Sequence, residues 1–403
     1  MNVTQKPQSK RILAIDILRG ITIAGMILVN NPGSWAHIFA PLEHAEWNGM
    51  TPTDLVFPFF MFVMGMCIFI SMQKYQFACN RQTVYKIIRR TLLLYLVGIF
   101  VGWFSRFCYR WAFPLEDATL GQQIWHTIWS FDTIRLSGVL ARLAICYGIT
   151  ALLAITVRHR YLLSIVISLL IGYTILLFCG NGFAYDETNI LSIVDRAVLT
   201  DAHMYHDNGI DPEGLLSTFP AIAHTLIGFL VGKLAFGKQK TVTATTQNDH
   251  KTGLILHNIM PLFIAGTILT FSGLLLAYGC PLNKKIWSPT FVLTTCGLAS
   301  TLLALLIWLI DVKGYKRWCR FFEVFGMNPL FLYVMSGVIA ILFGSFQFPF
   351  GDEPTSITGF LYRDVFSPLL GQTFGSLAHA LLIITILWSL GYILYKKRIF
   401  IKL

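Results

Sequence analysis

The densest run of polar side chains lies at residues 29–58, which read VNNPGSWAHIFAPLEHAEWNGMTPTDLVFP. His44 stands in this run close to Trp47 and Asn48, and Asp54 follows ten residues after the histidine. A carboxylate on one ring nitrogen of a histidine fixes its tautomer and raises the basicity of the other nitrogen. The pair could therefore form a general base; alternatively, Asp54 only complements the dipole of a helix that begins just before it.

Charged residues inside apolar runs are the second group of candidates. A charge within a membrane span costs a few kcal/mol on insertion scales, so each one needs a reason. Asp16 and Arg19 share a helix face and are either an ion pair that locks packing or an anion site. Arg135 and Arg142 are seven residues apart, so we expect them to share a face as well. Because guanidinium groups pair bidentately with phosphate, both arginines are candidates to bind a phosphate-bearing cofactor.

An acidic turn, DPEGLLST at 211–218, precedes a further apolar run. Asp-Pro favours a turn, and Ser and Thr suit a helix N-terminus. Asp211 and Glu213 either belong to a cap or line the rim of a cavity, where their carboxylates could bind sugar hydroxyls or an amine.

Two more segments carry candidate polar residues. In NKKIWSPT at 283–290, Lys284 and Lys285 lie in a loop on the side of the membrane whose loops hold few other lysines. Lysines in such a place suit an anionic ligand. In GMNP at 326–329, Gly and Pro interrupt an apolar run and free backbone groups near Asn328 for a partner.

The elements that must position these residues are membrane helices. Of the 403 residues 55% are apolar and only 13% charged, against roughly 25% charged in soluble domains. A spanning helix needs about 20 mainly apolar residues. The sequence therefore predicts an all-α polytopic membrane protein, one transmembrane domain over 1–403 with about ten helices in one bundle. These spans are 12–31, 51–72, 84–106, 134–157, 161–179, 217–236, 258–279, 288–310, 321–346 and 372–395. A weaker stretch at 357–370 could be re-entrant or interfacial.

The distribution of Lys and Arg predicts the orientation. Twenty-two of these 31 residues fall in the termini and alternate loops that lie on one side, and six fall in the opposite loops. By the positive-inside rule both termini are cytoplasmic, and the long loop at 180–216, rich in acidic residues, is outside. The net charge of +11 therefore reflects the topology of a protein embedded in the lipid bilayer, and we expect no nucleic-acid partner.

Several motifs are absent from the sequence. The eight cysteines form no CxxC pair, which argues against a disulfide framework and a metal site. No GxxxxGK[ST], GxSxG or HExxH occurs, so a P-loop ATPase, an esterase-type elbow and a zincin are not indicated.

The clusters together resemble the heparan-α-glucosaminide N-acetyltransferase family. The resemblance rests on RxLxxDILRGITIAGMILVN (11–30) and HAEWNGMTPTDLVFPFFMFVMG (44–65). It continues in family order with GVLARLA (138–144), DPEGLLST, NKKIWS, DVKG (311–314) and FGMN (325–328). It implies transfer of an acetyl group from cytosolic acetyl-CoA to the amino group of a glucosamine-like sugar or glycan acceptor on the far side of the membrane.

The resemblance also implies roles for individual residues. His44 matches the catalytic histidine, as general base or acetyl carrier, and Asn30 and Asp54 match its polar partners. An oxyanion donor is needed, for which Asn30 or Asn48 are candidates. Trp47 could stack on a sugar face or on the pantetheine arm of the cofactor, or it could anchor the chain at the membrane interface. We place Asp211 and Glu213 with the acceptor.

The remaining candidates fall on the cofactor side: Arg135, Arg142, Lys284, Lys285 and Asn328. Related enzymes suggest a homodimer. The compact architecture, with no glycosylation sequon in the outer loops, favours a bacterial inner membrane with the active site towards the periplasm.

Two other classes of function stay open. A transporter or flippase for a sugar or lipid-linked glycan would suit intramembrane charges and broken spans, and it predicts activity without acetyl-CoA. A non-enzymatic scaffold predicts that replacing His44 has no effect.

Overall fold

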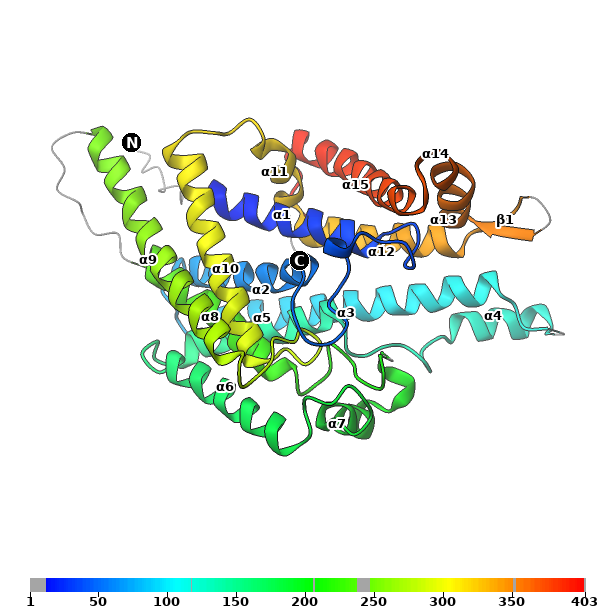
Figure 1. Cartoon of the computed structure of the whole chain (residues 1–403), viewed down its shortest axis with the longest axis horizontal. Coiled ribbons are helices and arrows are strands. Elements are labelled where there is room, and N and C mark those ends of the chain that lie inside the picture. The colour runs from blue at the N-terminus through cyan, green and yellow to red at the C-terminus, as the bar shows by residue number, and fades with distance from the viewer. Residues whose placement is uncertain (1–11, 117, 206, 238–246, 351–352, 402–403) are drawn as a thin grey trace.

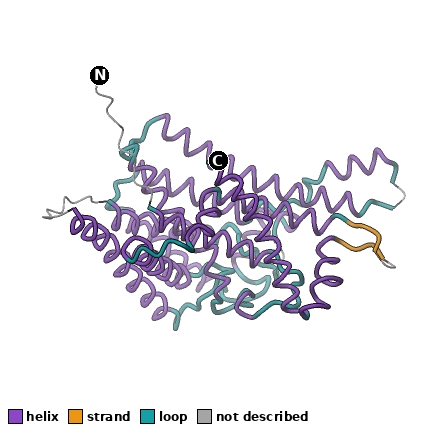
Figure 2. The backbone as a smooth tube through the Cα atoms, turned by 90° about the horizontal axis from the view of Figure 1, so that it is seen from above, coloured by secondary structure: helices purple, strands orange, loops and turns teal. Residues whose placement is uncertain are grey.

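The computed structural model describes residues 12–116, 118–205, 207–237, 247–350 and 353–401, and it is almost wholly helical (Figures 1 and 2). The helices are α1 (Leu13–Asn30), α2 (Val56–Gln73), α3 (Arg81–Ala112), α4 (Leu120–Ile128), α5 (Val139–Thr156), α6 (Leu162–Cys179), α7 (Ile190–Leu199), α8 (Thr218–Phe236), α9 (Gln247–Leu276), α10 (Pro289–Ile307), α11 (Cys319–Met327), α12 (Pro329–Ser345), α13 (Ile357–Gly359), α14 (Ser367–Leu370) and α15 (Gln372–Lys396). A two-stranded antiparallel hairpin, β1 (Gln347–Phe350) and β2 (Glu353–Ser356), follows α12 at one edge of the molecule (Figure 2).

The all-α membrane architecture predicted from the sequence is confirmed. Within the described residues, nine helices are long and apolar enough to cross a membrane, or ten if one bent pair counts as a single span. The side on which each terminus lies stays a prediction from the Lys and Arg pattern, and Lys6, Lys10 and Arg11 fall outside the described residues.

Two spans differ from their predicted form. The predicted span 321–346 is two helices, α11 and α12, which meet at an angle of 84°. Asn328 lies at the corner and Pro329 begins α12, where its missing N–H breaks no helical bond. The predicted span 134–157 becomes helical only at Val139. Gly138, the residue just before helix α5, has an extended backbone. Arg135 therefore precedes α5, and the expectation that it shares a helix face with Arg142 is wrong.

The third predicted span is longer than expected. Helix α3 has 32 residues, about 48 Å at 1.5 Å per residue, and its far end projects from the bundle beside α4 (Figure 1). The weaker stretch at 357–370 is also helical, formed by α13, a π-helical turn at Phe360–Phe366, and α14.

Small residues let the central helices approach closely. A Cβ on Gly65 of α2 would lie 2.1 Å from the carbonyl oxygen of Thr225 in α8, and one on Gly228 would lie 2.2 Å from that of Phe62. Helix α1 meets α11 in the same way, because a Cβ on Gly326 would lie 2.1 Å from the carbonyl oxygen of Asp16. Such backbone contacts are typical of membrane bundles, where packing replaces the hydrophobic effect.

This packed centre fixes the ends of α1, α2, α5, α8 and α10. The candidate residues lie mostly in the loops that join these ends and not within the helices. In Figure 1 the loops that flank α7 and the loop at 277–288 lie low in the view, and the loop at 31–51 descends towards them from the end of α1.

Candidate active site

Asp54 is held by the turn that begins the second span. Thr51 caps a 3₁₀ turn, Pro52–Leu55, with Pro in its first position and Asp54 in its third, as the sequence TPTD favours. One carboxylate oxygen, Oδ2, accepts from the backbone N–H groups of Ala45 and Thr51, both at 3.0 Å. The Thr51 hydroxyl lies 3.1 Å from the same oxygen and donates to the carbonyl oxygen of Glu43 at the shorter distance of 2.6 Å. The buried carboxylate is thus fixed by two backbone donors, which leaves Oδ1 for other partners.

Oδ1 of Asp54 faces His44. The distance from His44 Nδ1 to Asp54 Oδ1 is 2.7 Å, and the His44 side chain is 42% exposed while Asp54 is 1% exposed. Since a carboxylate accepts, Nδ1 is assigned the proton and Nε2 keeps its lone pair. The structure therefore brings together the two residues that the sequence paired, and the histidine is accessible.

A third charged residue joins this pair from another loop. Lys284 Nζ lies 2.9 Å from His44 Nδ1 and 3.3 Å from Asp54 Oδ1. Burial lowers the pKa of Lys284, and the charges of Asp54 and Glu213 oppose that shift. Lys284 was expected to bind the cofactor, but its contacts are with the candidate catalytic residues.

Backbone and amide contacts fasten the loop of His44 to the loop of Lys284. Gly49 N–H donates to the carbonyl oxygen of Leu282 at 2.8 Å, and Asn283 Nδ2 donates to Asn48 Oδ1 at 3.3 Å. The Asn283 side chain also accepts from the N–H of Ile286 at 3.1 Å, which closes the lysine loop on itself. Asn48, expected near the substrate, acts here as a bridge between two loops.

An aromatic pair covers the next part of the surface. The Trp47 indole stacks on Tyr185 with ring centroids 4.5 Å apart, and its N–H donates to the carbonyl oxygen of Phe183 at 3.0 Å. Lys285 Nζ lies 2.6 Å both from the Tyr185 hydroxyl and from Asp207 Oδ2. The ion pair with Asp207 and the bond to Tyr185 raise the pKa of Lys285 although burial acts to lower it. Trp47 and Lys285 thus belong to one loop-docking cluster.

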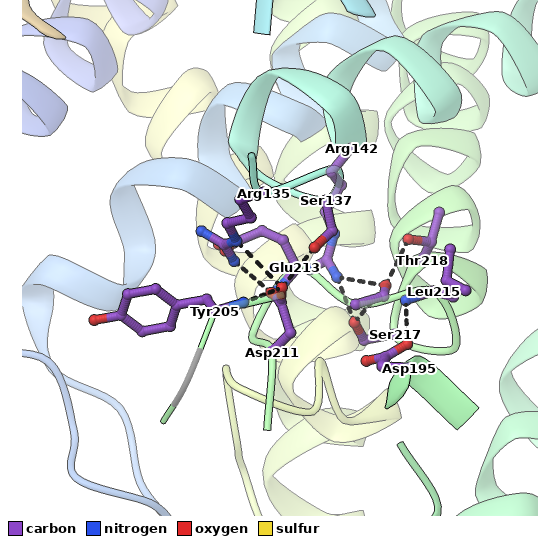
Figure 3. A network of polar contacts seen from close by, with 11 residues as sticks. Arg135, Ser137, Arg142, Asp195, Tyr205, Asp211, Glu213, Leu215, Ser217 and Thr218 are labelled. Atoms are coloured by element: carbon purple, nitrogen blue, oxygen red, sulfur yellow. Dashed lines mark hydrogen bonds and ion pairs between the residues drawn. The ribbon is translucent and has the colours of Figure 1, made fainter. Parts of the chain in front are cut away.

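A second polar network surrounds Arg135 (Figure 3). Its guanidinium binds Asp211, with Nε 3.2 Å from Oδ2, and its Nη2 lies 2.5 Å from Glu213 Oε2. Asp211 is fully buried and also accepts from Ser137 Oγ at 2.5 Å and the N–H of Tyr205 at 2.9 Å. Burial would raise the pKa of Asp211, but the bonds from Arg135 lower it overall. Both carboxylates bonded to Arg135 thus come from the acidic turn at 211–218.

The far end of the acidic turn is held by two buried charges (Figure 3). Arg142 donates to the Ser217 hydroxyl and to the carbonyl oxygen of Gly214, the latter at 3.3 Å. Asp195 of α7 accepts from the N–H of Leu215 at 2.8 Å, and burial raises its pKa to about 6. Sequence reasoning assigned no role to Asp195; the only signal was its place in the acidic outer loop.

A cavity of about 330 Å³ adjoins Arg135. Asn30 at the end of α1 lines it, and so do the small residues Gly98 and Gly102 of α3 and Gly337 of α12. Asn30 was expected beside His44; the structure places it in the wall of this cavity together with Arg135. Most of the lining is apolar, and Asn30, Arg135, Ser137 and Ser336 supply polar groups to it.

Asn328 lies apart from these groups, at the corner between α11 and α12. Its Nδ2 donates to the carbonyl oxygen of Ile399 at 3.0 Å, and its Oδ1 accepts from the N–H of Ile401 at 2.8 Å. The neighbouring Gly326 packs on Asp16, near the start of α1, whereas Asn30 ends that helix. Both polar atoms of Asn328 are thus bonded to the C-terminal segment.

Metal ligation was not expected. Among the residues that the structure describes, no three His, Cys, Asp or Glu side chains are grouped to hold a metal ion.

The described residues form a mainly helical bundle, in which nine or ten helices are long and apolar enough to cross a membrane, and its loops hold a His–Asp–Lys cluster. These features define a polytopic integral membrane protein with a candidate acid–base site. Residues 11–131 match a family described as "Domain of unknown function (DUF5009)".

The chain is also similar to two heparan-alpha-glucosaminide N-acetyltransferases. The protein of Mus musculus is 26% identical over 453 residues, covering 99% of this chain and 62% of its own length. The Homo sapiens protein is 28% identical over 447 residues, covering 98% of this chain and 60% of its own. The chain thus spans about three fifths of the length of these two relatives.

Proposed function

We propose that this protein is a transmembrane acetyltransferase that moves an acetyl group from acetyl-CoA to the amino group of a sugar or glycan acceptor. The observation that carries the proposal is the 2.7 Å contact between His44 and buried Asp54, in a chain related to N-acetyltransferases over nearly its whole length. Acetyl-CoA and a glucosamine-like acceptor are carried over from the names and chemistry of those relatives.

The geometry suits the chemistry of acyl transfer. A thioester is already activated, so the enzyme must mainly align it and remove a proton from the attacking amine. Asp54 holds the Nδ1 proton of His44, and the exposed Nε2 is then free to accept the proton of the amine or to carry the acetyl group itself. Both routes need the same orientation of the ring.

We assign the apolar cavity beside Arg135 to the acyl-bearing arm of the cofactor. Its small residues leave room for a flexible, largely apolar chain, and Asn30 and Arg135 add polar groups to its wall. Glu213 binds Arg135 at the cavity, and its charge also favours the ammonium form of Lys284 beside His44. The charges at the cavity and those around the histidine are therefore close enough to interact. Arg135 has two carboxylate partners already, which disfavours it as a phosphate ligand.

We further propose that the active site faces the periplasm of a bacterial inner membrane. The Lys and Arg distribution supports this orientation, because it puts the loops of His44 and Lys284 opposite the basic, cytoplasmic side. The transporter alternative gains one observation, the 84° break between α11 and α12, since broken helices line many transport sites.

Proteoliposomes separate the two functions. The purified protein is reconstituted with acetyl-CoA inside and glucosamine outside, or in the reverse arrangement, and both compartments are analysed by mass spectrometry. The proposal predicts N-acetylglucosamine and free CoA in one arrangement only. Movement of unmodified glucosamine without loss of acetyl-CoA would contradict it in favour of transport.

A further inference from the structure

The position of Lys284 over His44 is unusual in its geometry. Its Nζ lies 2.9 Å from Nδ1 and 3.4 Å from Nε2 of the same ring. An atom on the in-plane lone pair of one ring nitrogen lies well beyond hydrogen-bond distance of the other, since the two nitrogens point in different directions. An in-plane position between them would clash with the carbon that joins them. The ammonium therefore lies over the face of the imidazole, while Asp54 occupies the in-plane direction at Nδ1.

The surroundings keep this cation in place. Lys284 is 18% exposed, and Asp54 Oδ1 is 3.3 Å from its Nζ. The charged groups that act on it are Asp54 and Glu213, which favour the ammonium, and Lys285, which opposes it, with His44 beneath. The loop contacts of Asn283 fix the backbone next to it.

A cation over the ring face favours a negative charge that develops next to Nε2, the nitrogen that the nucleophile must approach, because opposite charges attract at this short distance.

We propose that Lys284 is a further catalytic residue, whose ammonium stabilises the oxyanion formed when the acceptor amine adds to the thioester beside His44. This inference rests on the proposed function. In the step, the amine nitrogen bonds to the carbonyl carbon, its proton passes to Nε2, and the carbonyl π pair moves to oxygen. The oxyanion then re-forms the carbonyl, the C–S bond breaks, and the CoA thiolate takes the proton from His44.

The first test is kinetic. Lys284→Met is expected to lower kcat about 10²- to 10³-fold with the KM for acetyl-CoA changed less than threefold, in the range found for loss of one oxyanion donor. Lys284→Arg keeps the charge and is expected to recover at least tenfold of the loss. Lys86→Met, which removes an exposed lysine that contacts only Tyr75, is the matched control and should retain wild-type rates. A Lys284→Met enzyme within threefold of the wild-type kcat would overturn the proposal.

The second test does not need acetyl transfer. His44 is accessible, so diethyl pyrocarbonate should modify it, and mass spectrometry gives the rate of modification at one fixed pH. Because the Lys284 ammonium covers one face of the ring, this rate is expected to rise at least threefold in Lys284→Met and to stay near the wild-type value in Lys284→Arg. An unchanged rate in folded, monodisperse Lys284→Met protein would show that the lysine does not lie against His44. If the wild type proved unable to transfer acetyl groups, the catalytic role would fall while this rate still decided the contact.

Discussion

Arg142 and Asp195 hold the two sides of one peptide group. Arg142 donates to the carbonyl oxygen of Gly214 at 3.3 Å, and Asp195 accepts from the N–H of Leu215, the next residue, at 2.8 Å. The acidic turn is thus held between a cation from α5 and an anion from α7. Its other end, at Asp211, binds Arg135 beside the cavity.

The pH dependence of stability should reveal Asp195. Burial raises its pKa from 3.8 to about 6, so ionisation costs the folded state, and the stability present below about pH 4 is lost as the pH rises through 6. The shift corresponds to about 3 kcal/mol at most. Asp195→Asn should therefore flatten the dependence of Tm on pH between 4 and 6 while the amide oxygen still accepts from Leu215. Scanning fluorimetry across this range measures it; parallel curves for the two proteins would contradict the assignment.

Gly214 should tolerate no side chain. A Cβ there would lie 1.8 Å from Asp195 Oδ2, so Gly214→Ala must displace the buried carboxylate. We expect a loss of about 1–3 kcal/mol, seen as a lower Tm. Gly121→Ala is the control, because nothing lies within 4 Å of its Cβ and alanine favours a helix. Equal Tm values for the two variants would argue against the packing described at Gly214.

The interior of the bundle was easier to predict than its loops. Spans such as 161–179 and 372–395 agree with α6 and α15 within a residue or two, since apolar length alone defines them. The sequence indicated an interruption at GMNP, 326–329, but not that the two helices on either side of it meet at 84°. Nor did it reveal the start of α5, because Ile134 and Leu136 extend the apolar pattern into a segment before Val139 that is not helical.

Within the site, local relations were predictable and distant ones were not. His44 and Asp54 lie ten residues apart and their pairing follows from the TPTD turn. Lys284 reaches the same histidine across 240 residues, and only the docking of two loops brings it there. Arg135 likewise meets Asp211 across 76 residues, so this partner could not be identified from the sequence.

The pairing of Arg135 can be tested by removing both partners. Arg135→Gln leaves buried Asp211 without its cation, and breaking such a pair costs about 3–5 kcal/mol. Adding Asp211→Asn should recover at least half of the lost Tm, since two uncharged amides can bond to one another. A double variant no more stable than Arg135→Gln would show that Arg135 stabilises the fold through other contacts.

Filling the cavity should weaken acetyl-CoA binding. A Cβ on Gly337 would face Val101 at 3.8 Å, so Gly337→Leu puts its side chain into the space assigned to the acyl-bearing arm. The KM for acetyl-CoA should rise at least tenfold while Tm changes little. Gly344→Leu, on the same helix with nothing near its Cβ and outside the cavity, should keep the wild-type KM. Equal KM values for the two variants would place the cofactor elsewhere.

The most direct test is acetyl-CoA turnover by the purified, detergent-solubilised protein with and without glucosamine, in the wild type and in His44→Ala. We predict glucosamine-dependent release of CoA with formation of N-acetylglucosamine, and a loss of at least 10³-fold in the variant because it lacks the imidazole that Asp54 orients. Absence of acetyl-CoA turnover across a panel of amino sugars and glycans, or an undiminished rate in His44→Ala, would contradict the acetyltransferase assignment.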